Sequence, residues 1–315
     1  KMAVVIVTAF ILSKGRTEDG ANPSAFKNIM IIAGTICAII LPENFSTAFL
    51  LFGVVFLMMY IGHVPLKKLG ILVGSLFSVV IVGIAFLIIT KDIDVPFMHR
   101  FDTWRTRIEK FVSNEEIAAS EFDTDKDGQV AHARIAVATS HIIGKGPGNS
   151  VQRDFLSQAF SDFIFAIVIE ELGLLGGAFV VFLYICLLIR VGRIAKRCNR
   201  SFPAFLVIGI GLLLVTQAVF NMMVAVGLAP VTGQPLPLIS RGGTSTIINC
   251  VYIGMLLSVS RYTASIEQEE LLRQAEVAPE KSAAVLLAEA VLAENQAQSA
   301  EEPTSEVLNS DSEFE

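Results

Sequence analysis

Long apolar runs are the feature that most restricts how this chain can fold. Residues 69–90 and 205–226 are each about as long as the roughly 20 residues that an α-helix needs to cross a bilayer. Lipid offers the backbone no hydrogen-bonding partners, so such runs cross it as helices. The chain has 315 residues, of which 53% are hydrophobic and only 17% are charged, whereas soluble proteins carry about 25% charged residues. We therefore predict an all-α, polytopic bundle of transmembrane helices.

Polar or Pro/Gly-rich segments divide the chain into seven apolar runs. We expect a transmembrane domain over residues 1–262, which includes a long hydrophilic loop at 91–161. The Ala/Glu-rich tail at 263–315 has too few bulky apolar residues to form a core, and we expect it to be disordered, with a transient helix around residues 271–297. The predicted spans are residues 2–12, 28–41, 46–61, 69–90, 163–188, 205–226 and 244–259.

The distribution of charge predicts the topology. Residues 264–315 hold 13 acidic and 2 basic side chains, so the rest of this chain of net charge −6 is mildly basic and suits anionic lipid headgroups. Short cytoplasmic loops are enriched in Lys and Arg. We therefore predict that the basic loops and the acidic tail are cytoplasmic, and that the loop at 91–161 lies outside the cytoplasmic membrane. The basic loops contain Lys14, Arg16, Lys27, Lys67, Lys68, Arg190, Arg193, Lys196, Arg197 and Arg200.

A carboxylate stands at the border between the long loop and a predicted span. Asp162 ends a polar stretch, and the apolar run starts at Phe163. A carboxylate that is partly shielded from water at a membrane surface suits a general base. Asp is also frequent at helix N-termini, where its side chain caps free N–H groups. Both interpretations, a catalytic base and a helix cap, fit the sequence.

Two groups of motifs carry a family resemblance. In the first, Gly148–Gln152 reads GNSVQ, Ser161–Ala166 reads SDFIFA and Glu170–Gly173 reads EELG. In the second, Gly227–Gly243 reads GLAPVTGQPLPLISRGG. Together they resemble the SEDS family (shape, elongation, division and sporulation proteins) over about residues 1–262. The GNSVQ form is similar to the division branch rather than the elongation branch.

The resemblance implies a peptidoglycan glycosyltransferase that polymerises lipid II into glycan strands during cell division. It implies ten spans, so we expect the chain to begin after about three N-terminal helices. It also implies a place in the bacterial cytoplasmic membrane at the septum, with a class B penicillin-binding transpeptidase and other divisome proteins as partners. Two other functions stay open: a flippase for lipid-linked precursors, and a non-catalytic divisome scaffold. We expect no nucleic-acid partner.

Such a reaction needs a base for the attacking sugar hydroxyl and cations for the leaving diphosphate. We predict Asp162 as the catalytic base. Lys145, Arg153 and Arg241 are the candidate cations, and Arg241 stands where many family members have Tyr. Gln152, within the first motif, is also predicted to bind substrate.

Two carboxylates lie inside a predicted span, where charged groups are costly and usually functional or paired. Positions 162, 166 and 170 would share one face of a helix, so we predict that Asp162 and Glu170 line one cavity. For Glu171 the alternative to substrate binding is a buried ion pair that orients the helices. With Ser240 of the second motif, both glutamates belong to the predicted substrate-binding set.

Other polar residues point to packing. Gln217 and Asn221 are four residues apart on a predicted span and are expected to form interhelical hydrogen bonds. No metal-ligand cluster is visible, and no cofactor is predicted with certainty, although a divalent cation (Mg²⁺ or Mn²⁺) would suit the departure of a diphosphate. The four cysteines show no paired spacing and are interpreted as small core residues; they are Cys37, Cys186, Cys198 and Cys250.

Overall fold

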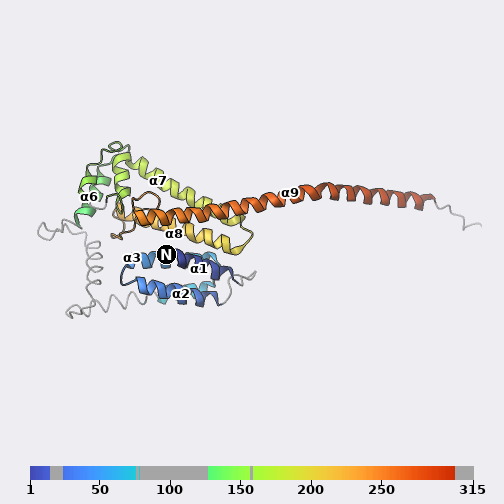
Figure 1. Cartoon of the computed structure of the whole chain (residues 1–315), viewed down its shortest axis with the longest axis horizontal. Helices are drawn as coiled ribbons and strands as arrows, with labels where there is room; N and C mark the ends of the chain where they lie inside the picture. Colours follow the sequence, from blue (N-terminus) through green and yellow to red (C-terminus); the bar gives the residue numbers. More distant parts are fainter. Residues whose placement is uncertain (15–23, 76–77, 79–126, 157–158, 302–315) are drawn as a thin grey trace, which may run out of the picture. The chain divides into compact units, whose positions relative to one another are not determined.

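The computed structural model describes residues 1–14, 24–75, 78, 127–156 and 159–301. Within those ranges every regular element is a helix (Figure 1), in agreement with the predicted all-α class. Residues 66–75 are helical, and the helices whose full bounds are described are α1 (Met2–Ser13), α2 (Ala25–Ile40), α3 (Phe45–Ile61), α6 (Asp127–Ala138), the short 3₁₀ helix η1 (Gln152–Phe155), α7 (Ile164–Arg197), α8 (Ser201–Ala225) and α9 (Gly243–Glu301).

Three helices are long and apolar enough to cross a membrane. They are α7, α8 and the part of α9 at Gly243–Arg273, whereas α1, α2 and α3 are shorter apolar helices. Most of the predicted span at 69–90, and residues 91–126 of the predicted loop, lie outside the described residues. The structure thus confirms a helical membrane protein, and the count of seven spans stays a prediction.

Helix α8 lies at the centre of the first compact unit, Lys1–Ser260, where it packs against α7, α1 and α3. Glycines allow close approach: a Cβ on Gly209 would lie 2.6 Å from Val5 Cγ1, and one on Gly211 would lie 2.5 Å from Val191 Cγ1. Apolar residues therefore surround α8, as expected for a buried helix.

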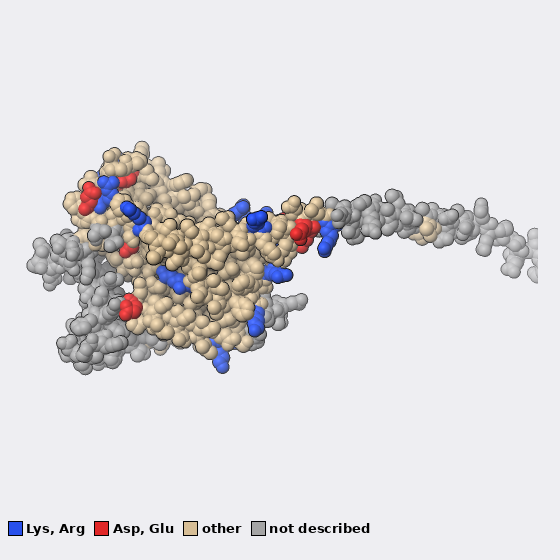
Figure 2. Space-filling view, in the orientation of Figure 1, with Lys and Arg blue, Asp and Glu red and all other residues tan. Residues whose placement is uncertain are grey.

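Helix α7 has a broad apolar face that no described helix covers. Figure 2 shows a largely uncharged surface over the helical body, with Lys and Arg side chains mainly at its margins. Exposed apolar residues without charges are what a lipid-facing surface requires. On α7 they include Leu172, Leu174, Leu175, Phe179, Phe182 and Leu183.

The loop at 229–241 and the Lys- and Arg-rich segments lie at opposite ends of the helices. Lys1 and Thr47, at the starts of α1 and α3, both bond to Gln234 of the loop at 229–241. The ends of α1 and α3 also lie together, where a Cβ on Gly62 would be 2.9 Å from Leu12 Cδ2. Lys14, which follows α1, and Lys67 and Lys68, which follow α3, therefore lie at the end of the unit opposite to that loop. The basic last turns of α7 lie at this end as well, because Phe202, at the start of the next helix, contacts Phe10 near the end of α1 with ring centroids 6.3 Å apart.

The first part of the C-terminal tail continues the last helix. Helix α9 continues to Glu301, and a second compact unit begins at Arg261. The tail has little apolar surface to bury, and its disorder stays a prediction, together with the transient helix expected around residues 271–297. Ala, Glu, Leu and Gln are strong helix formers, however, so their abundance favours a helix even without a core.

Candidate active site

Asp162 lies just before α7. The helix begins at Ile164, and Phe163 occupies its N-cap position without a side-chain capping bond. The alternative that Asp162 caps the helix is therefore wrong. The predicted helical face of 162, 166 and 170 is also wrong for Asp162, because this residue precedes the helix. Its carboxylate Oδ1 instead accepts a hydrogen bond from the Ser161 hydroxyl at 2.9 Å.

Three consecutive main-chain carbonyls hold the Asp162 segment in place. The Arg241 N–H donates to the Phe160 carbonyl at 2.8 Å. The Ser240 hydroxyl donates to the Ser161 carbonyl at 2.6 Å. The Asn221 amide donates to the Asp162 carbonyl at 2.7 Å. The two motifs are thus joined directly, and Asn221 of α8 joins them as well.

The loop at 229–241 is fixed to the helices beneath it. Gln217 donates to the Pro235 carbonyl at 2.9 Å, and the Tyr184 hydroxyl donates to the Pro237 carbonyl. Ser240, 8% exposed, accepts a bond from the Leu236 N–H at 2.7 Å. The loop also runs close to the candidate base, since a Cβ on Gly233 would lie 3.7 Å from Asp162 Oδ2. A non-helical backbone at membrane depth needs such internal partners.

Helix α7 is broken eleven residues after Asp162, at Gly173, which has φ 73°. The segment at 141–146 supplies the hydrogen bonds that the break removes. The N–H groups of Lys145 and Gly146 donate to the carbonyls of Glu170 and Glu171 at 3.0 and 2.9 Å. On the other side of the break, the N–H groups of 174 and 175 donate to the carbonyls of 141 and 142.

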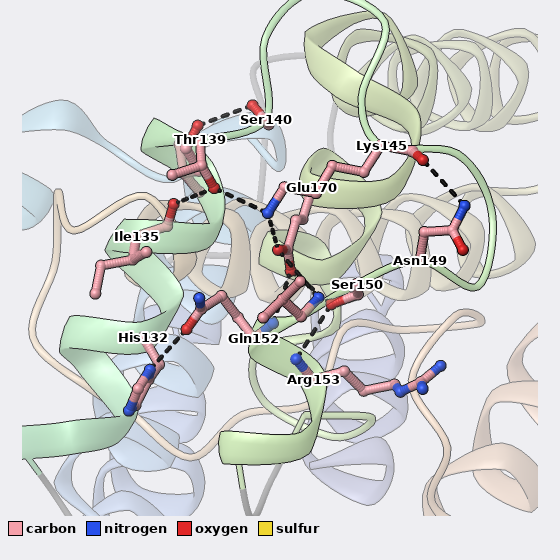
Figure 3. Close-up of polar contacts among 12 residues, drawn as sticks. His132, Ile135, Thr139, Ser140, Lys145, Asn149, Ser150, Gln152, Arg153 and Glu170 are labelled. Carbon is pink, nitrogen blue, oxygen red and sulfur yellow. Dashed lines mark hydrogen bonds and ion pairs between the residues drawn. The ribbon is translucent and has the colours of Figure 1, made fainter.

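Glu170 is the centre of the polar cluster in Figure 3 and is 0% exposed. Its Oε1 accepts a bond from Lys145 Nζ at 2.6 Å and one from the Val151 N–H at 3.3 Å. Its Oε2 accepts bonds from the Ser150 hydroxyl at 2.5 Å and the Gln152 N–H at 3.3 Å. The buried ion pair that the sequence suggested for Glu171 is therefore made by Glu170, and its carboxylate faces the GNSVQ segment rather than Asp162.

The remaining candidates surround this cluster. The Gln152 side chain bonds His132 Nδ1 at 2.6 Å, and the His132 ring stacks on Phe155. Arg153 points away from the cluster in Figure 3 and pairs with Asp154 at the surface.

Two predicted substrate-binding residues are accessible to solvent. Arg241 is exposed and Glu171 is half-buried. For Asn221 the sequence predicts only an interhelical hydrogen bond, because an amide on an apolar helix gives no sign of which backbone it will meet. In the structure this amide bonds the main-chain carbonyls of Asp162 and Gln234 instead. Among the described residues, no group of three or more His, Cys, Asp or Glu side chains is placed to hold a metal ion.

Comparisons with known proteins agree with this architecture. A family model described as "Cell cycle protein", for FtsW, RodA and SpoVE, matches residues 1–265. The chain is 30% identical to the probable peptidoglycan glycosyltransferase FtsW of Thioalkalivibrio sulfidiphilus, over 82% of this chain and 60% of that protein. It is 30% identical to the protein of the same name from Coxiella burnetii, over 84% of this chain and 67% of that protein. The chain thus spans roughly two thirds or less of the length of these relatives.

A solved structure has the same fold. It comes from work on the structural coordination of polymerization and crosslinking by a peptidoglycan synthase complex. The TM-score is 0.55 with 20% sequence identity, and the match covers 83% of this chain and 79% of the other. At this identity the likeness concerns the fold alone.

Proposed function

The chain belongs to the FtsW, RodA and SpoVE family of cell cycle proteins, and from this premise we propose that it polymerises lipid II into peptidoglycan glycan strands during cell division. The names of its relatives support this activity. The observation that carries the proposal is the position of Asp162. One carboxylate lies at the start of a membrane helix, and its backbone is joined to the second family motif.

In the proposed reaction, Asp162 is the general base. A sugar hydroxyl of the acceptor attacks the anomeric carbon of the donor as the hydroxyl proton passes to the Asp162 carboxylate. A new glycosidic C–O bond forms, and the bond between the anomeric carbon and the lipid diphosphate breaks. Ser161 donates to Oδ1, and among the described residues Oδ2 has no donor, so this oxygen is the one we expect to take the proton.

The leaving diphosphate needs positive charge. Arg241 is the strongest candidate, because its side chain is exposed and its backbone bonds the segment that carries Asp162. Arg153 is the second, since its bond to Asp154 lies at the surface and is weak enough to exchange for a phosphate. The third predicted cation, Lys145, is held by Glu170, so we propose that it acts on the loop shape rather than on the diphosphate.

We propose supporting roles for the other predicted residues. Glu170 and Ser240 are buried and engaged with protein groups, so they fix the two motifs. Gln152 holds α6 to the GNSVQ segment through His132. Glu171, half-buried at the break in α7, stays a candidate for direct contact with substrate.

A divalent cation, Mg²⁺ or Mn²⁺, also stays a proposal. Carboxylate and phosphate oxygens are the ligands that these ions prefer. Among the described residues, no three His, Cys, Asp or Glu side chains are placed to hold an ion, so oxygens of the diphosphate would supply most of its ligands. Such an ion would supply charge neutralisation to the leaving group.

The partner and the location follow from the same premise. We propose a class B penicillin-binding transpeptidase as the partner, because the solved structure with the same fold comes from a peptidoglycan synthase complex. We propose the inner membrane at the division septum as the location, with the Asp162 end outside and the tail in the cytoplasm. The opposite placement of the basic loops supports this orientation.

One observation favours a flippase as the second candidate. Broken helices are common in transporters, and α7 is broken at Gly173. The break is closed by hydrogen bonds from 141–146, however, which favours a rigid site over a moving gate.

One assay separates the enzyme, the flippase and the scaffold. The purified protein is incubated with its transpeptidase partner and labelled lipid II in detergent, and products are separated by size. Glycan polymer in the absence of a membrane supports the enzyme. Lipid movement in vesicles without polymer would support the flippase. If neither polymer nor lipid movement is observed, the scaffold is supported.

A further inference from the structure

Asn221 connects the candidate base to the second motif through one nitrogen atom. The residue lies on α8 and is 1% exposed. Its Nδ2 donates to the Asp162 carbonyl at 2.7 Å and to the Gln234 carbonyl at 2.8 Å. Both N–H groups of the amide are therefore used, each on a different motif. Because the two N–H bonds diverge at a fixed angle, they fix the relative position of the two carbonyls.

The other end of the side chain makes no hydrogen bond with any described residue. Asn221 Oδ1 is buried and has no donor. A buried acceptor without a donor destabilises a fold. The amide cannot gain by turning over, because its oxygen would then face two carbonyls. Packing alone therefore does not account for an asparagine here, and within the described part of the chain the bridge is the polar interaction that its side chain makes.

We propose that Asn221 is a positioning residue for Asp162. This inference rests on the proposed glycosyl transfer. The neighbouring clamps, Ser240 and the Arg241 N–H, act on the carbonyls of residues 161 and 160. Asn221 acts on residue 162 itself and sets the orientation of the backbone from which the carboxylate projects. A displacement of about 1 Å at a reacting group can reduce the rate by about 100-fold.

The chain offers a matched control on the same helix. Gln217 lies one turn from Asn221 and donates to the Pro235 carbonyl at 2.9 Å. Both amides thus anchor adjacent carbonyls of one loop, but of these two only Asn221 bonds Asp162. A merely structural role predicts similar consequences for the two truncations. A positioning role predicts different rates.

The experiment compares Asn221→Ala with Gln217→Ala in the purified protein with its transpeptidase partner and lipid II. We expect Asn221→Ala to lower kcat by about 10- to 100-fold with KM changed by less than about threefold. Gln217→Ala should keep kcat within about threefold, although both variants melt at lower temperature. Equal kcat for the two variants would overturn the inference.

A double-variant cycle tests whether Asn221 acts through Asp162. In an Asp162→Glu protein the base is already displaced, so adding Asn221→Ala should cost less than about threefold in kcat. Interacting residues show such non-additivity, and independent residues do not. A full additional loss would contradict the inference.

Two outcomes distinguish this inference from the proposed function. If Asp162→Asn polymerises at the wild-type rate, the general-base role fails, and the positioning role fails with it. If Asp162→Asn is inactive but the Asn221 variant has the wild-type kcat, the positioning role alone fails. Should Asn221→Ala not fold, Asn221→Gln keeps the amide and moves it by one methylene. A fall of about tenfold in its kcat with a nearly unchanged melting temperature supports the inference, and an unchanged kcat contradicts it.

Discussion

Gly144 and Gly173 lie back to back where the segment at 141–146 crosses the break in α7. A Cβ on Gly144 would lie 2.4 Å from the backbone nitrogen of Gly173, and a Cβ on Gly173 would lie 2.5 Å from that of Gly144. Both residues also have positive φ, at 80° and 73°. Glycine is therefore required twice here, for backbone conformation and for space.

Substitution at this crossing should be strongly destabilising. In Gly173→Ala the new methyl group would lie 2.2 Å from the Ile142 carbonyl oxygen, and the backbone conformation, with φ 73° and ψ −173°, adds roughly 1–3 kcal/mol of strain for a residue other than glycine. We expect a fall in melting temperature in detergent and a loss of polymerisation. The matched control is Gly192→Ala, on the same helix, where nothing lies within 4 Å of the new Cβ. That variant should be neutral or slightly more stable; equal melting temperatures for the two proteins would disprove the close crossing.

Breaking the Lys145–Glu170 pair should destabilise the protein by about 1.5–3 kcal/mol, because a buried carboxylate loses its cation but keeps its bonds from Ser150 and two backbone N–H groups. Lys145→Met keeps the length of the side chain and removes its charge. Asp154→Asn is the control, since it breaks an exposed pair with Arg153 and should cost about 0–1 kcal/mol. Lys145→Met combined with Glu170→Gln should recover part of the loss. Chemical unfolding of the three proteins measures these differences, and no extra cost for Lys145→Met over Asp154→Asn would refute the buried pair.

Asp162→Asn tests the base directly. Asparagine keeps the size of the side chain and can still accept the bond from Ser161, but it cannot take the proton. General-base catalysis is worth about 100- to 10,000-fold, so polymer formation should fall by that order with little change in melting temperature. Asp162→Glu should be weak rather than inactive, because the base is displaced by about one methylene. Wild-type polymerisation by Asp162→Asn would remove this residue from the mechanism.

The proposed topology can be measured by cysteine labelling of intact spheroplasts. In a background without the four native cysteines, we expect an impermeable reagent to label Arg241→Cys. Lys67→Cys and Arg197→Cys should be labelled only after permeabilisation, because their loops are rich in Lys and Arg and lie at the opposite end of the unit. Labelling of Lys67→Cys from outside would invert the orientation.

The sequence by itself determined the class of fold, the family and the residue at the membrane border. Apolar runs of sufficient length can only be helices in lipid, so α7 and α8 could be predicted closely. The motifs around Asp162 and Ser240 identified the family, since they are long and occur in order. These inferences depend on local composition and on residue order, which the sequence states directly.

Only the tertiary structure decided which of these residues meet. The helical face predicted for Asp162 failed because the helix starts two residues later, and the ion pair formed on Glu170 rather than on Glu171. Asn221 reaches Asp162 across 59 positions of sequence, and Gly144 reaches Gly173 only because α7 is broken there. Such contacts depend on how separate segments pack, and periodicity within one segment carries no information about the backbone that another segment will bring beside it.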